Sequence, residues 1–143
     1  REGRLREAVA TYLRAAAAAP DESIILVALG TAYLQADDLA SARPHLAKAV
    51  ALDQRYYYSR MGLGYAHLQQ GGAAAAIVEL EESLRLLPTQ RAAFLLAEAY
   101  EKAGKASAAR EFYRAVADAD SRSKLGKFAA ERQRLLEGKN ELE

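Results

Sequence analysis

Few side chains in this sequence belong to the types that carry catalysis or bind metals. Cysteine is absent, and the only two histidines are His45 and His67. A metal site needs three or four converging ligands, and a nucleophile needs a neighbouring base. Neither pattern occurs around the two histidines, and no Asp/Glu/His set has metal-ligand spacing. We therefore predict no catalytic residue, no metal site and no cofactor, and a protein that is not an enzyme.

Charge and hydropathy exclude two further classes of function. Twenty basic residues balance nineteen acidic ones, a formal net charge of +1, whereas a nucleic-acid-binding domain carries a clustered basic surface. The longest apolar run, residues 24–30, is far shorter than the roughly 18–20 residues that span a bilayer. We expect neither a nucleic-acid partner nor direct membrane insertion. The glycine pairs at 62–64 and 71–72 follow no predicted strand, so they do not indicate a phosphate-binding loop.

An internal repeat reveals the elements that must position any functional side chain. Aligned with itself at a shift near 34 residues, the chain agrees in several columns. The small-residue column is Ala8, Ala42, Ala76 and Ala109, and the column four residues later is Tyr12, Leu46, Leu80 and Tyr113. Further columns are Gly3, Asp37, Gly71 and Gly104; Leu29, Leu63 and Leu96; Gly30, Gly64 and Ala97; Tyr33, His67 and Tyr100; and Pro20, Gln54 and Pro88. A repeat of this period indicates an array of similar supersecondary units.

The columns resemble the tetratricopeptide-repeat (TPR) family, whose unit reads aromatic-x2-Leu-Gly-x2-Tyr, then Ala-x3-Phe, then Pro. The first full unit carries Leu29-Gly30-x2-Tyr33, Ala42-x3-Leu46 and Gln54 in the proline slot. The leading aromatic is missing in all three full units, where Leu26, Arg60 and Ala93 stand. The resemblance implies an all-α fold, a right-handed superhelical array of antiparallel helix pairs. Its expected parts are a second helix of a truncated repeat (1–22), three repeats (23–56, 57–89 and 90–120) and a C-terminal capping helix (121–143).

The residue types in these columns have physical reasons. Gly30, Gly64 and Ala97 are small because the two helices of a pair cross there, with the alanine column as their expected small partners. Gly71 and Gly104 suit the left-handed residue that ends a helix. We predict helices at about 3–18, 23–36, 40–53, 57–70, 73–87, 90–103, 106–119 and 122–138.

The resemblance places candidate ligand-contacting residues on the concave face, which the first helix of every unit lines. These residues are Ile24, Val27, Thr31, Tyr58, Met61, Tyr65, Arg91, Phe94 and Glu98. Most of these nine residues are apolar or aromatic, and they lie outside the positions that we expect to form the core. This pattern favours a groove that binds an amphipathic helix or an extended segment with bulky side chains. Tighter packing between neighbouring helices, or an internal tail in the groove, would explain the same residues.

One TPR subclass grips acidic peptide tails through a carboxylate clamp of lysine, asparagine and arginine. The matching positions here hold Val27, Thr31, Gly62, Arg91 and Leu95, of which only Arg91 is charged. The sequence therefore predicts a groove that binds by apolar anchors. Tyr56, Tyr57 and Tyr58 form a run at a repeat junction and are either packed side chains or further contacts.

The function expected from these patterns is a protein–protein interaction scaffold that binds a peptide or protein segment in its concave, largely apolar groove. One alternative is a self-assembling array, since the N-terminal helix has an apolar face (Leu5, Ala8, Val9 and Tyr12) without a covering helix. Another is the recruiting arm of an enzyme whose catalytic domain lies elsewhere. The chain begins at Arg1 rather than Met, so we expect a fragment. Its alanine-rich composition weakly favours a bacterial cytoplasm or periplasm and leaves the compartment unknown.

Overall fold

A computed structural model describes residues 1–139 of the chain, and within that range every regular element is an α-helix. The helices are α1 (Glu2–Ala18), α2 (Ser23–Gln35), α3 (Leu39–Leu52), α4 (Tyr57–Gln69), α5 (Ala73–Leu86), α6 (Gln90–Lys102), α7 (Ala106–Ala119) and α8 (Lys124–Leu136). Their bounds agree with the predicted ones to within two residues. The predicted all-α superhelical array is confirmed. The last four residues of the predicted capping segment lie outside the described range.

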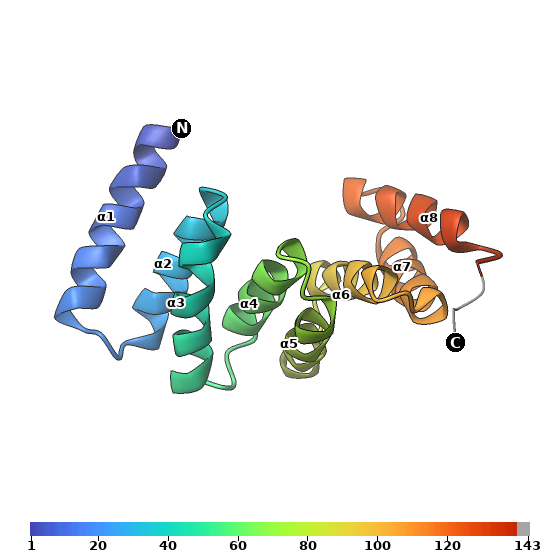
Figure 1. Ribbon diagram of the computed structural model, residues 1–143. Helices are drawn as coiled ribbons and strands as arrows, with labels where there is room; N and C mark the ends of the chain where they lie inside the picture. The colour runs from blue at the N-terminus through green and yellow to red at the C-terminus, as the bar shows by residue number, and fades with distance from the viewer. Residues whose placement is uncertain (140–143) are drawn as a thin grey trace.

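The helices form a stack of antiparallel pairs that runs from α1 at one end to α8 at the other (Figure 1). The most extensive contacts join α2 to α3, α4 to α5, α6 to α7 and α7 to α8. Contacts between α2 and α4, and between α4 and α6, place the three first helices next to each other. Side chains of these three helices therefore share one face of the stack.

Two glycines allow the helices of a pair to cross closely. A Cβ atom on Gly30 would lie 2.5 Å from the Cγ atom of Leu46, and one on Gly64 would lie 2.6 Å from the Cγ atom of Leu80. Both distances are too short for a real side chain, so these positions require glycine. We predicted that the alanine column would lie opposite these glycines. This prediction was wrong in detail, because the leucine four residues after each alanine lies closest to the glycine. In the third pair Ala97 packs in one cluster with Tyr113.

The turns between paired helices follow the predicted glycine column with one exception. Gly71 and Gly104 have φ values of +83° and +77°, in the left-handed region that favours glycine. Asp37 takes the same role with a φ of 59°. Gly3, in the same sequence column, was expected at a turn but lies inside α1. Because α1 begins at Glu2, Gly3 takes part in the first turn of that helix.

Two buried serines fix the start of α4 through their hydroxyl groups. Ser59 Oγ donates to the carbonyl oxygen of Tyr56 at 2.8 Å, and Ser83 Oγ donates to the carbonyl oxygen of Tyr57 at 2.9 Å. Both hydroxyls are fully buried, where an unpaired polar group would be costly. These bonds tie the start of α4 to the tyrosine run and to the end of α5.

The C-terminal helix begins in register with the first helices of the repeats. Ser123 caps α8 by accepting a hydrogen bond from Gly126 N at 2.9 Å, as Thr89 caps α6 by accepting one from Ala92 N at 3.2 Å. The slot that Ala97 fills in α6 holds Glu131 in α8, and this side chain is exposed. A charged residue at this position disfavours a further helix packed closely against it.

Candidate functional site: the concave groove

The shared face of α2, α4 and α6 is hollowed by two adjoining depressions. One, of about 220 Å³, is lined by Thr31, Leu34, Gln35, Tyr58, Met61, Gly62, Tyr65, Arg91 and Leu95. The other, of about 310 Å³, reaches α1 and is lined by Ala8, Tyr12, Ile24, Val27, Ala28, Thr31, Ala32, Gln35, Tyr56 and Tyr58. They share Thr31, Gln35 and Tyr58, so they form one continuous surface, which we call the groove.

The residues predicted for the groove do not all lie free on it. Val27 and Met61 were expected to be left over after the core was filled, yet their side chains are 5% and 8% exposed. Both belong to core clusters, Val27 with Leu26 and Ala49, and Met61 with Leu68. Their column faces the neighbouring first helices, which pack against it. They form the floor of the groove and do not project from it.

Aromatic side chains supply much of the groove wall. Tyr58 and Tyr65 are half-buried and line the depression over α4, and both also pack against the core cluster around Met61. The rings of Tyr56, Tyr57 and Tyr58 lie 5.8–6.2 Å apart, centroid to centroid. Mutual packing fixes the tyrosine run, while Tyr56 and Tyr58 still border the groove. The two readings of this run, packing and contact, are therefore compatible.

At its C-terminal end the shared face is bordered by α8. The Phe94 ring lies 5.7 Å from the Tyr113 ring and 5.7 Å from the Phe128 ring, centroid to centroid. Phe94 was predicted as a free groove anchor, but it packs between two other rings. The exposed aromatic at this end is Phe128 of α8, which is 49% exposed.

A charged network lies beside Phe128. Arg132 pairs with the carboxylate of Glu101, and Tyr113 Oη donates to Glu101 Oε2 at 2.9 Å. These residues, with Glu98 and Lys102, line a depression of about 330 Å³. Burial raises the pKa of Glu98 above its ordinary value, opposed by the charges of Lys102 and Arg132. Burial, together with the hydrogen bond to Glu101, also raises the pKa of Tyr113.

The groove proper is nearly free of charge. Among the residues that line its two depressions, Arg91 alone is ionised at neutral pH. Arg91 is exposed and lies at the start of α6. The predicted site thus separates into a largely apolar part over α1, α2, α4 and the first half of α6, and a charged part over the second half of α6 and α8.

The predicted groove residues included none on the first or the last helix, although both helices line these depressions. Tyr12 and Ala8 extend the groove onto α1, and Phe128 and Arg132 extend the charged part onto α8. The repeat register contained the signal, because Phe128 and Arg132 lie 34 residues after Phe94 and Glu98. We predicted residues 121–143 only as a capping helix and therefore did not extend the repeat register to them.

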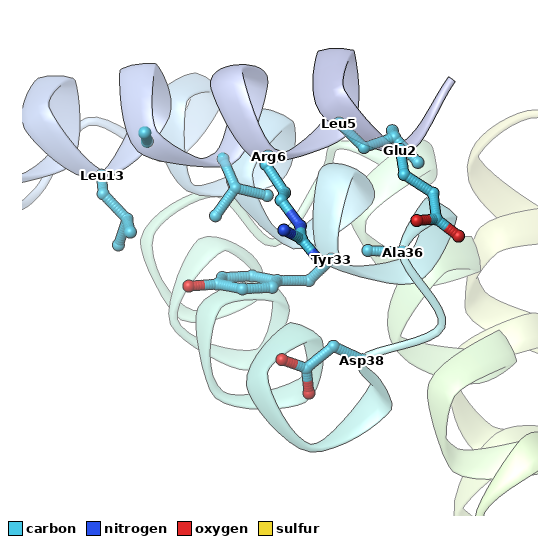
Figure 2. Close-up of a pocket in the computed structure, with 9 residues that line it drawn as sticks. Glu2, Leu5, Arg6, Leu13, Tyr33, Ala36 and Asp38 are labelled. Atoms are coloured by element: carbon cyan, nitrogen blue, oxygen red, sulfur yellow. The ribbon is translucent and has the colours of Figure 1, made fainter.

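A separate depression of about 470 Å³ lies on the other side of α1. Leu5, Val9 and Leu13 of α1 form one wall, and Tyr33, Ala36 and Asp38 form the other, with Arg6 reaching across toward Tyr33 (Figure 2). Tyr33 is stacked on His45 with ring centroids 5.6 Å apart. Burial lowers the pKa of His45, with a smaller effect from the charge of Lys48.

Neither a metal centre nor a membrane span was found in residues 1–139. No group of three or more His, Cys, Asp or Glu side chains in this range lies together to hold a metal ion. None of the helices described is both long enough and apolar enough to cross a bilayer.

Comparison with solved structures places the fold among known repeat proteins. MamA (MSR-1) is 25% identical, with a TM-score of 0.74 over 85% of this chain and 70% of that one. TTC0263, a thermophilic TPR protein of Thermus thermophilus, is 20% identical, with a TM-score of 0.76 over 91% and 73%. The first TPR domain of Spaghetti (RPAP3), solved with an HSP90 peptide, is 16% identical, with a TM-score of 0.74 over 80% and 90%.

A search of the curated proteins found no match. The family model described as Tetratricopeptide repeat matches three overlapping segments, residues 1–56, 27–90 and 61–124. Together these segments cover residues 1–124, well over half of the chain. The chain therefore belongs to the tetratricopeptide-repeat family.

Proposed function

We propose that this protein is an interaction scaffold that binds a peptide or protein segment in its groove, chiefly through apolar and aromatic contacts. The observation that carries the proposal is the continuous surface over α1, α2 and α4, with half-buried tyrosines and a single ionised residue. Tyrosine offers a large contact area at a low cost in conformational entropy. The fold supports a scaffold role, since the RPAP3 domain of the same architecture was solved with a bound peptide.

The proposed partner differs in kind from an acidic peptide tail. Binding of two carboxylates needs several cationic or amide donors converging on one point. Of the five positions that form such a clamp in related domains, Arg91 alone is charged here, and Met61 and Leu95 beside it are apolar. We expect a segment that places bulky apolar side chains against Tyr58 and Tyr65, with Arg91 orienting it.

Tyr65→Ala is the sharpest test. Truncation of an aromatic anchor typically costs about 2 kcal/mol or more of binding free energy, so the dissociation constant of a partner identified by pull-down should rise at least about tenfold. Isothermal titration would measure the constant, and circular dichroism would check that the helices persist. Phe94→Ala is a poorer probe than the sequence suggested, because Phe94 packs against Phe128 and Tyr113.

The control substitution is Val78→Ala, which removes a side chain 62% exposed on α5, outside the groove. Val78→Ala should leave the dissociation constant unchanged. A partner that binds Tyr65→Ala as tightly as the parent chain, and loses affinity on Val78→Ala, would place recognition on the outer surface and refute the groove.

A further inference from the structure

The contact between α2 and α4 lacks a side chain that the next contact along the stack has. In the repeat register, Gly62 of α4 occupies the position that Leu95 occupies in α6. Leu95 is 6% exposed and packs in one cluster with Leu68 of α4, which is 1% exposed. Leu34 of α2 is the equivalent of Leu68, yet it is only half-buried and lines a depression of the groove. Gly62 offers Leu34 no side chain to pack against.

We call the part of the groove at Leu34 and Gly62 the notch. Met61, Tyr65 and Leu95 border it within the same depression. A glycine inside a helix costs about 1 kcal/mol relative to a good helix former. At Gly62 this cost is accompanied by an apolar side chain, that of Leu34, left partly open to water in the middle of the array.

We propose that the notch receives one leucine side chain of a partner protein's segment, and that an acidic residue beside this leucine pairs with Arg91. The inference deepens the proposed function and rests on it, because the notch is part of the groove. It makes Gly62 and Leu34 the residues that decide which segments bind.

The size and lining of the depression fit one apolar side chain. Its volume is about 220 Å³, and an apolar cavity of roughly 150 Å³ is enough to hold a benzene molecule. The next repeat shows which side chain suits the position, because Leu95 occupies it there and leaves Leu68 almost fully buried. A leucine from the partner would cover Leu34 in the same way and remove both side chains from water.

Charge complementarity assigns the acidic residue. Arg91 is exposed and lines the same depression as Gly62. Among the described residues, none forms a hydrogen bond or an ion pair with Arg91. The rest of the lining is uncharged at neutral pH. An exposed ion pair contributes little affinity, so the leucine supplies most of the binding and the acidic residue selects the orientation of the segment.

Further repeats of the same chain would not fill the notch. In a repeat array each unit contacts only its neighbours, and the notch lies between α2 and α4, two first helices that already contact each other. Residues that extend the array would stack on α1 or α8, the helices at its two ends (Figure 1). The open position at Gly62 therefore does not depend on where the array begins or ends.

Selection from a phage library of random linear peptides on immobilised residues 1–143 tests the assigned pattern. We expect enriched peptides to share a leucine with an aspartate or glutamate beside it or one residue away. The same selection on Gly62→Leu is the control, because the new side chain would take the place that Leu95 takes in α6, and the pattern should disappear. Failure to enrich peptides, or a consensus without leucine, would overturn the proposal.

An enriched peptide, made synthetically and labelled with a dye, allows the notch to be measured by fluorescence anisotropy. Replacing its leucine by alanine should weaken binding at least about tenfold, and Gly62→Leu in the chain should do the same. Gly62→Ala is the milder variant, because its Cβ atom would lie 3.3 Å from Leu46 Cδ2 and 3.7 Å from Leu34 Cδ1. It should weaken binding by about threefold without lowering the urea midpoint of the chain. Val78→Ala should leave binding unchanged.

A change of preference gives a test that a loss of stability cannot imitate. Leu34→Ala enlarges the notch, so a peptide with phenylalanine in place of its leucine should bind this variant more tightly than it binds the parent chain. The leucine peptide should bind Leu34→Ala more weakly than the parent chain, because part of the packing is lost. If both chains rank the two peptides in the same order, the leucine does not lie in the notch.

The contact to Arg91 is tested by exchanging the charges. Arg91→Glu should weaken binding of the enriched peptide about three- to tenfold at low salt, because two like charges then face each other. Replacing the acidic residue of the peptide by arginine should restore affinity for Arg91→Glu and reduce it for the parent chain. Absence of this rescue would contradict the assigned pair.

Two further results separate the inference from its alternatives. Residues 140–143 read Asn-Glu-Leu-Glu, so Leu142→Ala in the full chain is compared with the parent. If this variant binds the peptide more tightly and converts a sedimenting dimer into a monomer, a second copy occupies the notch and the assigned partner is wrong. If Tyr65→Ala weakens peptide binding while Gly62→Leu, Leu34→Ala and the leucine replacement have no effect, the groove stands and the notch fails. If none of these four changes has an effect, the proposed function itself fails.

Discussion

At the scale of single residues, the helix crossings decide which positions tolerate change. Gly64 lies inside α4, where glycine costs about 1 kcal/mol relative to a good helix former. The chain nevertheless keeps glycine there, because a Cβ atom would lie 2.6 Å from the Cγ atom of Leu80. Close packing thus outweighs local helix propensity at this position.

Gly64→Leu should therefore lower the free energy of unfolding by roughly 1–3 kcal/mol or more, through overpacking of the crossing. Gly3→Leu is the matched control, because a Cβ atom on Gly3 meets nothing within 4 Å and the residue also lies in a helix. Gly3→Leu should be neutral or stabilising through helix propensity. Urea denaturation would compare the two variants, and equal stability of both would contradict the role assigned to the crossing.

At the scale of helices, the two ends of the array differ in how much they bury. In α8, Ala129 and Leu136 are almost fully buried and belong to one cluster with Tyr113 and Val116 of α7. In α1, no residue is fully buried, and Leu13 is exposed. The stack is thus tightly closed at its C-terminal end and loosely held at its N-terminal end.

Removing residues 122–143 should accordingly cost more stability than removing residues 1–18. Loss of α8 uncovers Val116 and Tyr113, and the burial of Leu136 alone is worth about 2 kcal/mol or more. Loss of α1 uncovers the side of α2 that carries Val27. Urea midpoints of the two truncated chains would measure the difference, and a lower midpoint for the chain without α1 would contradict this ranking.

At the scale of the whole molecule, charged residues are unevenly distributed, although the numbers of basic and acidic residues are nearly equal. The formal net charge is +1, and the ionised groups near the concave face gather at its C-terminal end, around Glu98, Glu101 and Arg132. The groove over α1, α2 and α4 has Arg91 alone on its lining. Long-range steering of a charged partner is therefore not expected.

Partner binding in the groove should depend little on salt. Raising the ionic strength from about 0.05 M to 0.5 M screens exposed charge pairs, but contacts to Tyr58 and Tyr65 are apolar and should persist. We expect less than about a threefold change in the dissociation constant of a partner, measured by titration across the salt series. Arg91→Ala at low salt serves as the control for the one charge on the lining. A steep loss of affinity with salt would indicate recognition at the charged part beside α8.

Much of this molecule was predictable because its repeat is a local property of the sequence. A close helix crossing needs small residues, and a left-handed turn favours glycine, so both leave a mark at fixed spacing in the sequence. The resemblance of these columns to the tetratricopeptide-repeat unit then implied the helix pairing and the helix bounds. The sequence also established the absence of cysteine and the near balance of charge, which exclude several kinds of chemistry. All of these are statements about one residue or its neighbours along the chain.

Which side chains remain available for a partner was decided only by the tertiary structure. Val27 and Met61 lie in a column that points toward the groove, yet contact with neighbouring helices buries them. Phe94 belongs to the same column, but its ring packs against those of Phe128 and Tyr113. Exposure depends on what packs against a residue from elsewhere in the chain. Repeat spacing therefore determined where each residue lies on its helix, and the stacking of helices determined which of them a partner can reach.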